Sequence, residues 1–192
     1  MDTDATVPDG PSETLLCTAE TWPYIVGTPR HAKLMAWLQA NGIDPRDVSV
    51  TNDLKIVHTA DGPVIDHHVH LRNSNGSLYV DPDNPPQPAQ EHRTTPCTVP
   101  PPPAKRADIT TRALLQCVVD RTSLRKAVPL LDSLQIPRAW DLLCTVHPEK
   151  VVGAAFDREE GRGYLDCGIN ITWAFLTPEG EARLVELGGA IS

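Results

Sequence analysis

Apolar residues in the first third of the chain repeat first with a helical period and then with a strand period. Leu34, Trp37 and Leu38 follow the i, i+3, i+4 spacing of one helix face. The stretch 28–44 that contains them opens on a Thr-Pro pair, and both residues suit a helix start. Gly42 stands where a left-handed helix end favours glycine. The pattern therefore predicts one amphipathic helix.

Three runs with strand character follow this helix, and turn residues separate them. The runs cover residues 48–59, 63–72 and 77–81, with Ala-Asp-Gly and Asn-Ser-Asn-Gly between them. Sequences rich in Asn and Gly typically form tight turns. We therefore expect residues 28–81 to form a helix packed on a small antiparallel sheet.

Polar residues and prolines dominate the chain on both sides of this module. Residues 1–27 begin acidic and polar, without an apolar leader segment, and are expected to be disordered or loosely packed. Nine of the 19 prolines lie in residues 82–106. Proline disfavours a helix, and the run Pro100–Pro103 favours an extended polyproline II spacer. The composition predicts a linker over residues 82–106 between two domains.

The second half, residues 107–192, combines helical and strand patterns. We expect three helices, two strands joined by a turn, and a final helix. In that order the elements cover residues 107–121, 122–135, 136–147, 150–157, 164–176 and 176–189, with the turn at 158–163. Pro129 is expected to kink or split the helix 122–135. Thr177 and Pro178 suit the start of the last helix, and two glycines close it. The chain is therefore predicted to be α+β.

The net charge of −8 is spread unevenly over the two halves. Residues 1–103 carry 6 Lys and Arg against 13 Asp and Glu, a net charge of −7, whereas residues 104–192 carry 11 against 12. The first half is a poor partner for nucleic acid, because phosphates repel it. No window holds the roughly 20 apolar residues that a membrane span needs. Five scattered cysteines without Cys-x-x-Cys spacing fit a reducing compartment, so a cytoplasmic location is expected.

The sharpest chemical motif is the sequence GPVIDHHVHL at residues 62–71. Strand alternation places Asp66, His68 and His70 on one face. An apolar run that leads into Asp-x-His-x-His resembles the start of the amidohydrolase metal site, which implies a metal-dependent hydrolase. That family needs a (β/α)8 barrel of about 250 residues, and the strand–helix alternation of a barrel is missing. Arg72 on the same face also disfavours a cation. We therefore expect a solvent-facing strand surface and no cofactor, and keep the hydrolase as the alternative function.

Other chemistry-bearing and aromatic residues favour structural roles. The sequence contains no Gly-x-Gly-x-x-Gly, phosphate-loop or Gly-x-Ser-x-Gly motif. Trp140 and Trp173 are spaced like core residues. Glu159 and Glu160 fall in the expected turn and are predicted to be solvated. None of these residues indicates an enzyme, and the chain is expected to be non-enzymatic.

Residues 174–187, AFLTPEGEARLVEL, resemble the end of bacterial winged-helix regulators, where the second wing strand runs into a Leu-Thr-x-x-Gly helix start. The order of expected elements extends this resemblance to residues 107–188. It implies that helix 136–147 reads the major groove and that turn 158–163 is the wing. The helix is apolar and acidic between its ends, which favours protein contact as much as double-stranded DNA. The expected DNA or partner contacts are Arg121, Arg125, Lys126, Arg138, Arg158 and Arg162.

The first half resembles a small module of unknown function found in proteins of actinobacteria and their phages. The residues that carry this resemblance are AWLQANGIDPRDV at 36–48 and RTTPCTVPPPP at 93–103. The two resemblances together imply an accessory or regulatory protein of a phage or mobile element. Its expected partner is a protein, such as a recombinase or a transcription component, and direct DNA contact stays open.

Overall fold

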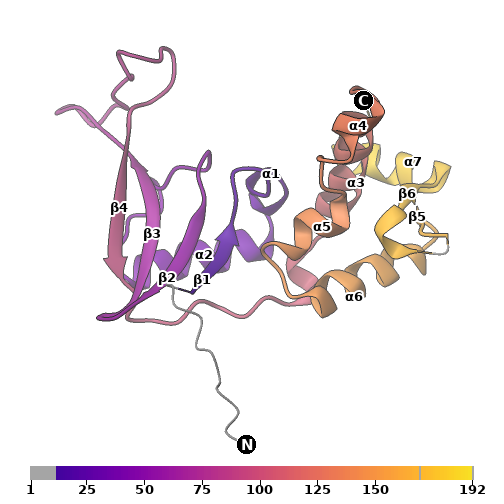
Figure 1. Ribbon diagram of the computed structural model, residues 1–192, viewed down its shortest axis with the longest axis horizontal. Coiled ribbons are helices and arrows are strands. Elements are labelled where there is room, and N and C mark those ends of the chain that lie inside the picture. The colour runs from indigo at the N-terminus through magenta and orange to yellow at the C-terminus, as the bar shows by residue number, and fades with distance from the viewer. Residues whose placement is uncertain (1–11, 169, 192) are drawn as a thin grey trace, which may run out of the picture.

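The computed structural model describes residues 12–168 and 170–191, and it places a β-sheet at one end and a group of helices at the other (Figure 1). The sheet has four strands in the order β1-β2-β3-β4, and all neighbours are antiparallel. The strands are β1 (Glu13–Cys17), β2 (Leu54–Thr59), β3 (Gly62–His70) and β4 (Gln90–Pro96). The α+β class is confirmed.

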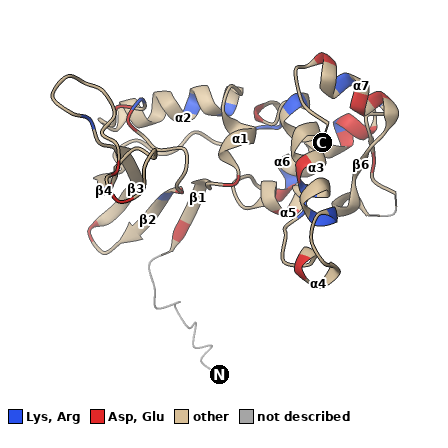
Figure 2. Ribbon diagram, turned by 90° about the horizontal axis from the view of Figure 1, so that it is seen from above, with Lys and Arg blue, Asp and Glu red and all other residues tan. Residues whose placement is uncertain are grey.

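Helix α2 (Pro29–Ala40) covers one face of the sheet, as both ribbon views show (Figures 1 and 2). Thr28 caps the helix, because its Oγ1 accepts a hydrogen bond from the amide of His31 at 3.3 Å. Gly42 has a φ of 79° and ends the helix, as predicted. The apolar face of α2 packs against buried sheet residues, among them Ile56 and Ile65.

Residues 12–27 are packed, contrary to the expectation for residues 1–27. Strand β1 pairs with β2, and α1 (Trp22–Ile25) follows it. Trp22 is 1% exposed, and its indole N–H donates to the carbonyl of Asn52 at 2.9 Å. Burial of a side chain of this size stabilises the fold by about 2–3 kcal/mol. This packing orders the segment even though its sequence has only a weak strand pattern. Residues 1–11 lie outside the described residues.

The predicted linker over residues 82–106 is wrong, because most of this stretch is held by other elements. Strand β4 forms where six residues in a row, 90–95, are free of proline, and Pro96 ends it at a sheet edge. The proline run then crosses α2. Trp37 donates to the carbonyl of Val99 at 2.7 Å, and Arg30 donates to that of Pro102 at 2.6 Å. We call residues 97–103 the proline strap.

The expected strand at residues 77–81 is reduced to single bridges. Arg72 pairs with Leu78 and Val80 pairs with Pro88, outside the regular sheet. These residues lie on an exposed arm that projects beyond β3 and β4 (Figure 1). Isolated bridges flank this stretch on both sides, and they pair too few residues to form a regular strand.

The second half is built around α3, against which most of the other helices pack. Its elements are η1 (Arg106–Asp108), α3 (Thr111–Lys126), α4 (Leu130–Ser133), α5 (Ala139–Cys144), α6 (Glu149–Glu160), β5 (Leu165–Asp166), η2 (Ile171–Trp173), β6 (Phe175–Leu176) and α7 (Pro178–Glu186). Buried Leu114, Leu115 and Val118 of α3 form the centre of this core. Helix α7 is capped by Thr177, whose Oγ1 accepts from the amide of Gly180 at 3.0 Å, as predicted.

Two predictions for the second half are wrong. No separate helix starts at residue 122, because α3 continues to Lys126; the break at Pro129 falls where a split was expected, and the single turn of α4 follows it. The expected strand 150–157 is helix α6. Its buried residues Val151, Val152, Ala155 and Phe156 repeat at i, i+1, i+4, i+5, which is a helical face. The turn 158–163 therefore begins as the last turn of α6 and is no wing tip.

The two halves meet through buried contacts. The hydroxyl of Tyr24 donates to Asp120 at 3.0 Å, and Lys33 pairs with Asp108 at 2.6 Å. Arg121 of α3 pairs with Glu20. Val146 belongs to the buried cluster of the first half. The halves are thus joined by side chains as well as by the strap. No helix in residues 12–168 or 170–191 is long and apolar enough to cross a membrane.

Candidate functional site

The histidine motif lies on strand β3, and the predicted alternation is confirmed. Ile65, His67 and Val69 are buried, whereas Asp66, His68 and His70 are half-buried on the opposite face. His67 is 2% exposed, and burial lowers its pKa, which keeps the imidazole neutral. A neutral buried imidazole here acts as part of the core under α2.

The opposite face gathers Asp66, His68 and His92, because the register of β3 and β4 places His92 directly across from His68. His92 Nε2 lies 3.0 Å from Asp66 Oδ1, and the rings of His68 and His92 have centroids 5.2 Å apart. Within the described ranges, no group of three or more His, Cys, Asp and Glu side chains is arranged to hold a metal ion. The arrangement supports a hydrogen-bonded strand surface more than the metal centre of a hydrolase.

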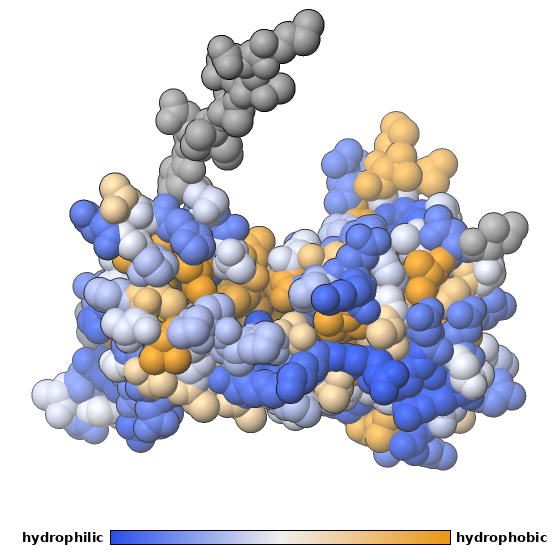
Figure 3. Space-filling model, turned by 90° about the horizontal axis from the view of Figure 1, so that it is seen from below, coloured by the Kyte–Doolittle hydropathy of each residue, from blue (hydrophilic) through white to orange (hydrophobic). Residues whose placement is uncertain are grey.

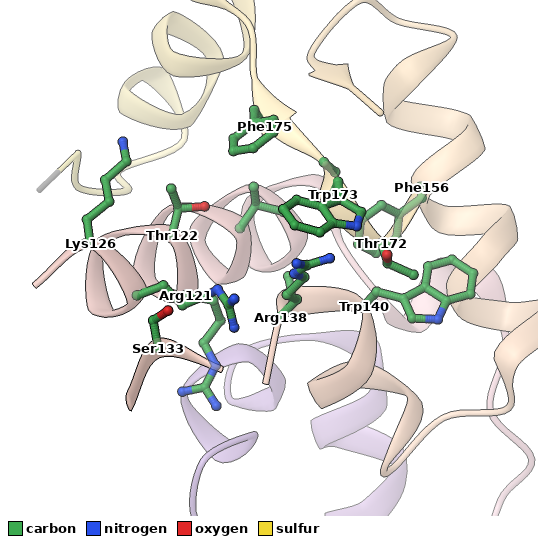
Figure 4. Close-up of a pocket in the computed structure, with 14 residues that line it drawn as sticks. Arg121, Thr122, Lys126, Ser133, Arg138, Trp140, Phe156, Thr172, Trp173 and Phe175 are labelled. Atoms are coloured by element: carbon green, nitrogen blue, oxygen red, sulfur yellow. The ribbon is translucent and has the colours of Figure 1, made fainter. Parts of the chain in front are cut away.

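A second candidate site is a cavity of about 240 Å³ between α3, α4, α5, α6 and the β6 region. We call it the aromatic pocket (Figure 4). Its lining contains the cations Arg121, Arg125, Lys126 and Arg138 and the aromatic residues Trp140, Phe156, Trp173 and Phe175. Among the described residues, no Asp or Glu lines it. Four of the six predicted contact residues are thus brought together here.

The cations of the aromatic pocket differ in how far their charge is compensated. Arg121 is 7% exposed and pairs with Glu20, yet its Nε has no hydrogen-bond partner among the described residues. Arg125 donates to the carbonyl of Ile136 at 2.5 Å, which is a neutral acceptor. Lys126 is exposed at the end of α3. The pocket therefore carries an excess of positive charge.

Arg138 contacts the aromatic part of the pocket lining. Its guanidinium lies 3.1 Å from the ring centroid of Trp173, which is a cation–π contact. Desolvation and the neighbouring charge of Arg125 lower the pKa of Arg138. Trp140 and Phe156 meet edge to face, with centroids 5.3 Å apart. Aromatic walls beside a fixed cation are suited to a flat ligand.

Arg158 and Arg162 lie elsewhere, because both bind the carboxylate of Glu159. This side chain is fully buried and lies 2.5 Å from Arg158 and 3.3 Å from Arg162. The hydroxyl of Thr111 donates to it at 2.9 Å. Arg158 also donates to the carbonyl of Ile109 at 2.8 Å. These two arginines are structural, and the prediction of a solvated Glu159 is wrong.

Trp173 is 53% exposed, so its assignment to the core is wrong, and Phe175 beside it is 51% exposed. The nearby sequence Cys-Gly-Ile-Asn contains the turn residues that would have signalled a loop before them. Only short strands pair here, because the chain between β5 and β6 is a loop that contains η2.

The exposed leucines of α4 are a further feature that the sequence pattern did not indicate. Leu130, Leu131 and Leu134 are 79%, 78% and 65% exposed. We call them the α4 ridge. The helix is a single turn between Pro129 and Pro137, so it is too short to turn an apolar face inward. Figure 3 shows an apolar projection at the upper edge of the helical half.

Helix α6 follows α5 after the short connection 145–148. Its exposed charged residues are Glu149, Lys150, Asp157 and Glu160. This face has more acidic than basic side chains. Phosphates would repel such a face.

Comparisons with protein-family models, with curated proteins and with solved structures found no match to this chain.

Proposed function

We propose that this chain is a non-enzymatic accessory or regulatory protein, and that it binds a protein partner through the α4 ridge. The observation that carries the proposal is the exposure of Leu130, Leu131 and Leu134 together. Contiguous exposed apolar residues with a polar rim are typical of protein interaction sites. Lys126 and Arg138 lie beside the ridge at the aromatic pocket, so an apolar partner surface with acidic residues complements it.

The element order supports a winged-helix arrangement for the second half. Helices α3, α5 and α6 are followed by the β5–β6 pair and then by α7. With the phage-module resemblance of the first half, this order favours a regulator of a phage or mobile element. A recombinase or a component of transcription fits as the partner. The acidic α6 face weighs against direct duplex reading.

The proposal is tested by site-specific photocrosslinking in the host cell. The chain carries benzoylphenylalanine at Leu131 or, as a matched control, at Val50, which is 44% exposed on the first half. We expect one defined protein to be captured at Leu131 and not at Val50. Leu130→Ser with Leu134→Ser should weaken the purified complex at least tenfold, because apolar anchors dominate interface energy. Thermal unfolding controls for folding.

Three outcomes would overturn the proposal. Equal capture at both positions would show that the α4 ridge is no specific surface. Loss of concentration-dependent self-association in Leu131→Ser would assign the ridge to a second copy of the chain. Duplex binding by the purified chain near 50 mM salt would favour DNA, if Arg125→Ala with Lys126→Ala reduces the salt slope by about two.

A further inference from the structure

The aromatic pocket has the size and lining of a small-molecule site. Its volume of about 240 Å³ lies just below the roughly 300–1,000 Å³ of pockets that hold drug-sized ligands. Such sites are mostly apolar, with a few polar groups that orient the ligand. The pocket is therefore suited to a molecule of one or two rings.

The pocket has a polar end and an aromatic end (Figure 4). Lys126, Thr122 and Ser133 lie toward one side, whereas Trp140 and Phe156 lie toward the other. Arg138 lies between the two ends, under Trp173. A ligand that matches this division has a flat apolar body and one polar end group.

The charges of the pocket specify the sign of that end group. Arg125, Lys126 and Arg138 form no ion pair with any described residue, and no carboxylate lines the cavity. Arg121 is more than nine-tenths buried and also lines the cavity, while its partner Glu20 is 57% exposed. Cations that outnumber their anionic partners favour an anionic end group on the ligand.

We propose that the aromatic pocket binds a small aromatic carboxylate with one or two fused rings. The planar guanidinium groups match a carboxylate, which can accept two parallel hydrogen bonds. A single negative charge also costs less to transfer into a mostly apolar cavity than a phosphate with two charges. This site does not depend on a partner at the α4 ridge, so the two proposals stand or fall separately.

The test is calorimetric titration of the full-length chain with 2-naphthoate and with the neutral 2-naphthalenemethanol. We expect the acid to bind with a Kd on the order of 100 μM, as typical ligand efficiencies give for a molecule of this size. The neutral alcohol should bind at least tenfold more weakly, because it cannot pair with the cations. Raising the salt concentration should weaken the binding of the acid and leave the binding of the alcohol unchanged.

Substitutions locate the site. Lys126→Gln and Arg138→Gln should each weaken the binding of 2-naphthoate about tenfold and leave the binding of the alcohol unchanged. Phe175→Ala should weaken both probes, because it removes a wall of the cavity. The matched control is Arg162→Gln, an exposed arginine outside the pocket, which should change neither. Circular dichroism melting confirms that each variant is folded.

Several results would overturn the proposal. No heat at millimolar 2-naphthoate would exclude this ligand class. Equal affinity for the acid and the alcohol, or affinity unchanged in Lys126→Gln and Arg138→Gln, would show binding elsewhere. A blocked peptide with one phenylalanine between two aspartates is the third probe. If it binds where 2-naphthoate does not, the pocket receives a segment of a protein instead.

Discussion

At the scale of single residues, the arginines of the second half differ in whether they pair with a carboxylate. Arg158 and Arg162 are bound to the buried Glu159, whereas Arg125 and Arg138 have no carboxylate partner in the part of the chain that the structure describes. A buried carboxylate requires such partners, because its transfer from water is costly. Proximity in sequence therefore says little about which arginine is free to bind a ligand.

Removal of this carboxylate should destabilise the second half. Glu159→Ala leaves the side chain of Arg158, which is 16% exposed, without its charge partner. We expect a loss of about 3 kcal/mol in the free energy of unfolding, measured by urea denaturation. The control Glu186→Ala removes an exposed carboxylate of α7 and should cost below about 0.5 kcal/mol. Equal losses of stability in the two variants would show that the buried cluster stabilises the fold no more than an exposed ion pair does.

At the scale of elements, two helices depend on glycine in different ways. Gly180 of α7 lies against the backbone of Tyr164, and a Cβ there would come within 2.0 Å of the Tyr164 carbonyl oxygen. Gly153 of α6 faces Trp140, where a Cβ would lie 3.4 Å from the ring. The backbone of Tyr164 lies so close that position 180 requires glycine, whereas the contact at position 153 leaves room for a Cβ.

Alanine at these two positions should have opposite effects. Gly180→Ala forces α7 away from the chain before β5 and should cost about 2 kcal/mol or more. Gly153→Ala adds helix propensity worth about 0.5–1 kcal/mol against a contact that needs little adjustment. Thermal melting compares both with the unchanged chain. A stabilised Gly180→Ala variant would contradict the packing of α7 on this segment.

At the scale of the whole molecule, the junction of the two halves contains buried ionisable groups. His147 is 4% exposed, and its pKa is lowered to about 4, chiefly by burial and further by Arg30, while Asp108 opposes the shift. The imidazole is neutral in the folded state. The unfolded chain binds a proton with a pKa near 6.5, so the junction is sensitive to acid.

Stability should therefore fall as the pH drops from about 6.5 to about 4. In this window His147 is protonated in the unfolded state and neutral in the folded state. The free energy of unfolding therefore falls by about 3 kcal/mol through His147. The lowered pKa of His67 acts in the same direction. His147→Gln should flatten the dependence of the urea midpoint on pH, whereas the control at exposed His58, His58→Gln, should retain it. Identical slopes would contradict a neutral buried His147.

The proline strap makes a second prediction for the whole molecule. Residues 97–103 are held on α2, so a broad-specificity protease should cut first in the exposed arm of residues 73–88. The two pieces should stay associated on gel filtration, because β4 remains paired with β3. Early cleavage within the strap, with release of two separate halves, would contradict this packing.

The sequence by itself determined the elements whose signals are local. Helix α2, its threonine cap and Gly42, the alternation of β3 and the start of α7 all follow from neighbouring residues. Four of the six predicted contact residues also reach one site, the aromatic pocket. Caps, turns and amphipathic periods act over a few residues, which is why a single sequence reveals them.

Only the tertiary structure decided the elements and the site that depend on distant partners. The proline-rich stretch becomes β4 and the strap because β3 and α2 supply hydrogen-bond partners. Glu159 is buried because Thr111 and two arginines surround it, and Trp173 is exposed because its loop leaves the core. Burial and pairing across a fold are properties of many residues together, so no local pattern encodes them.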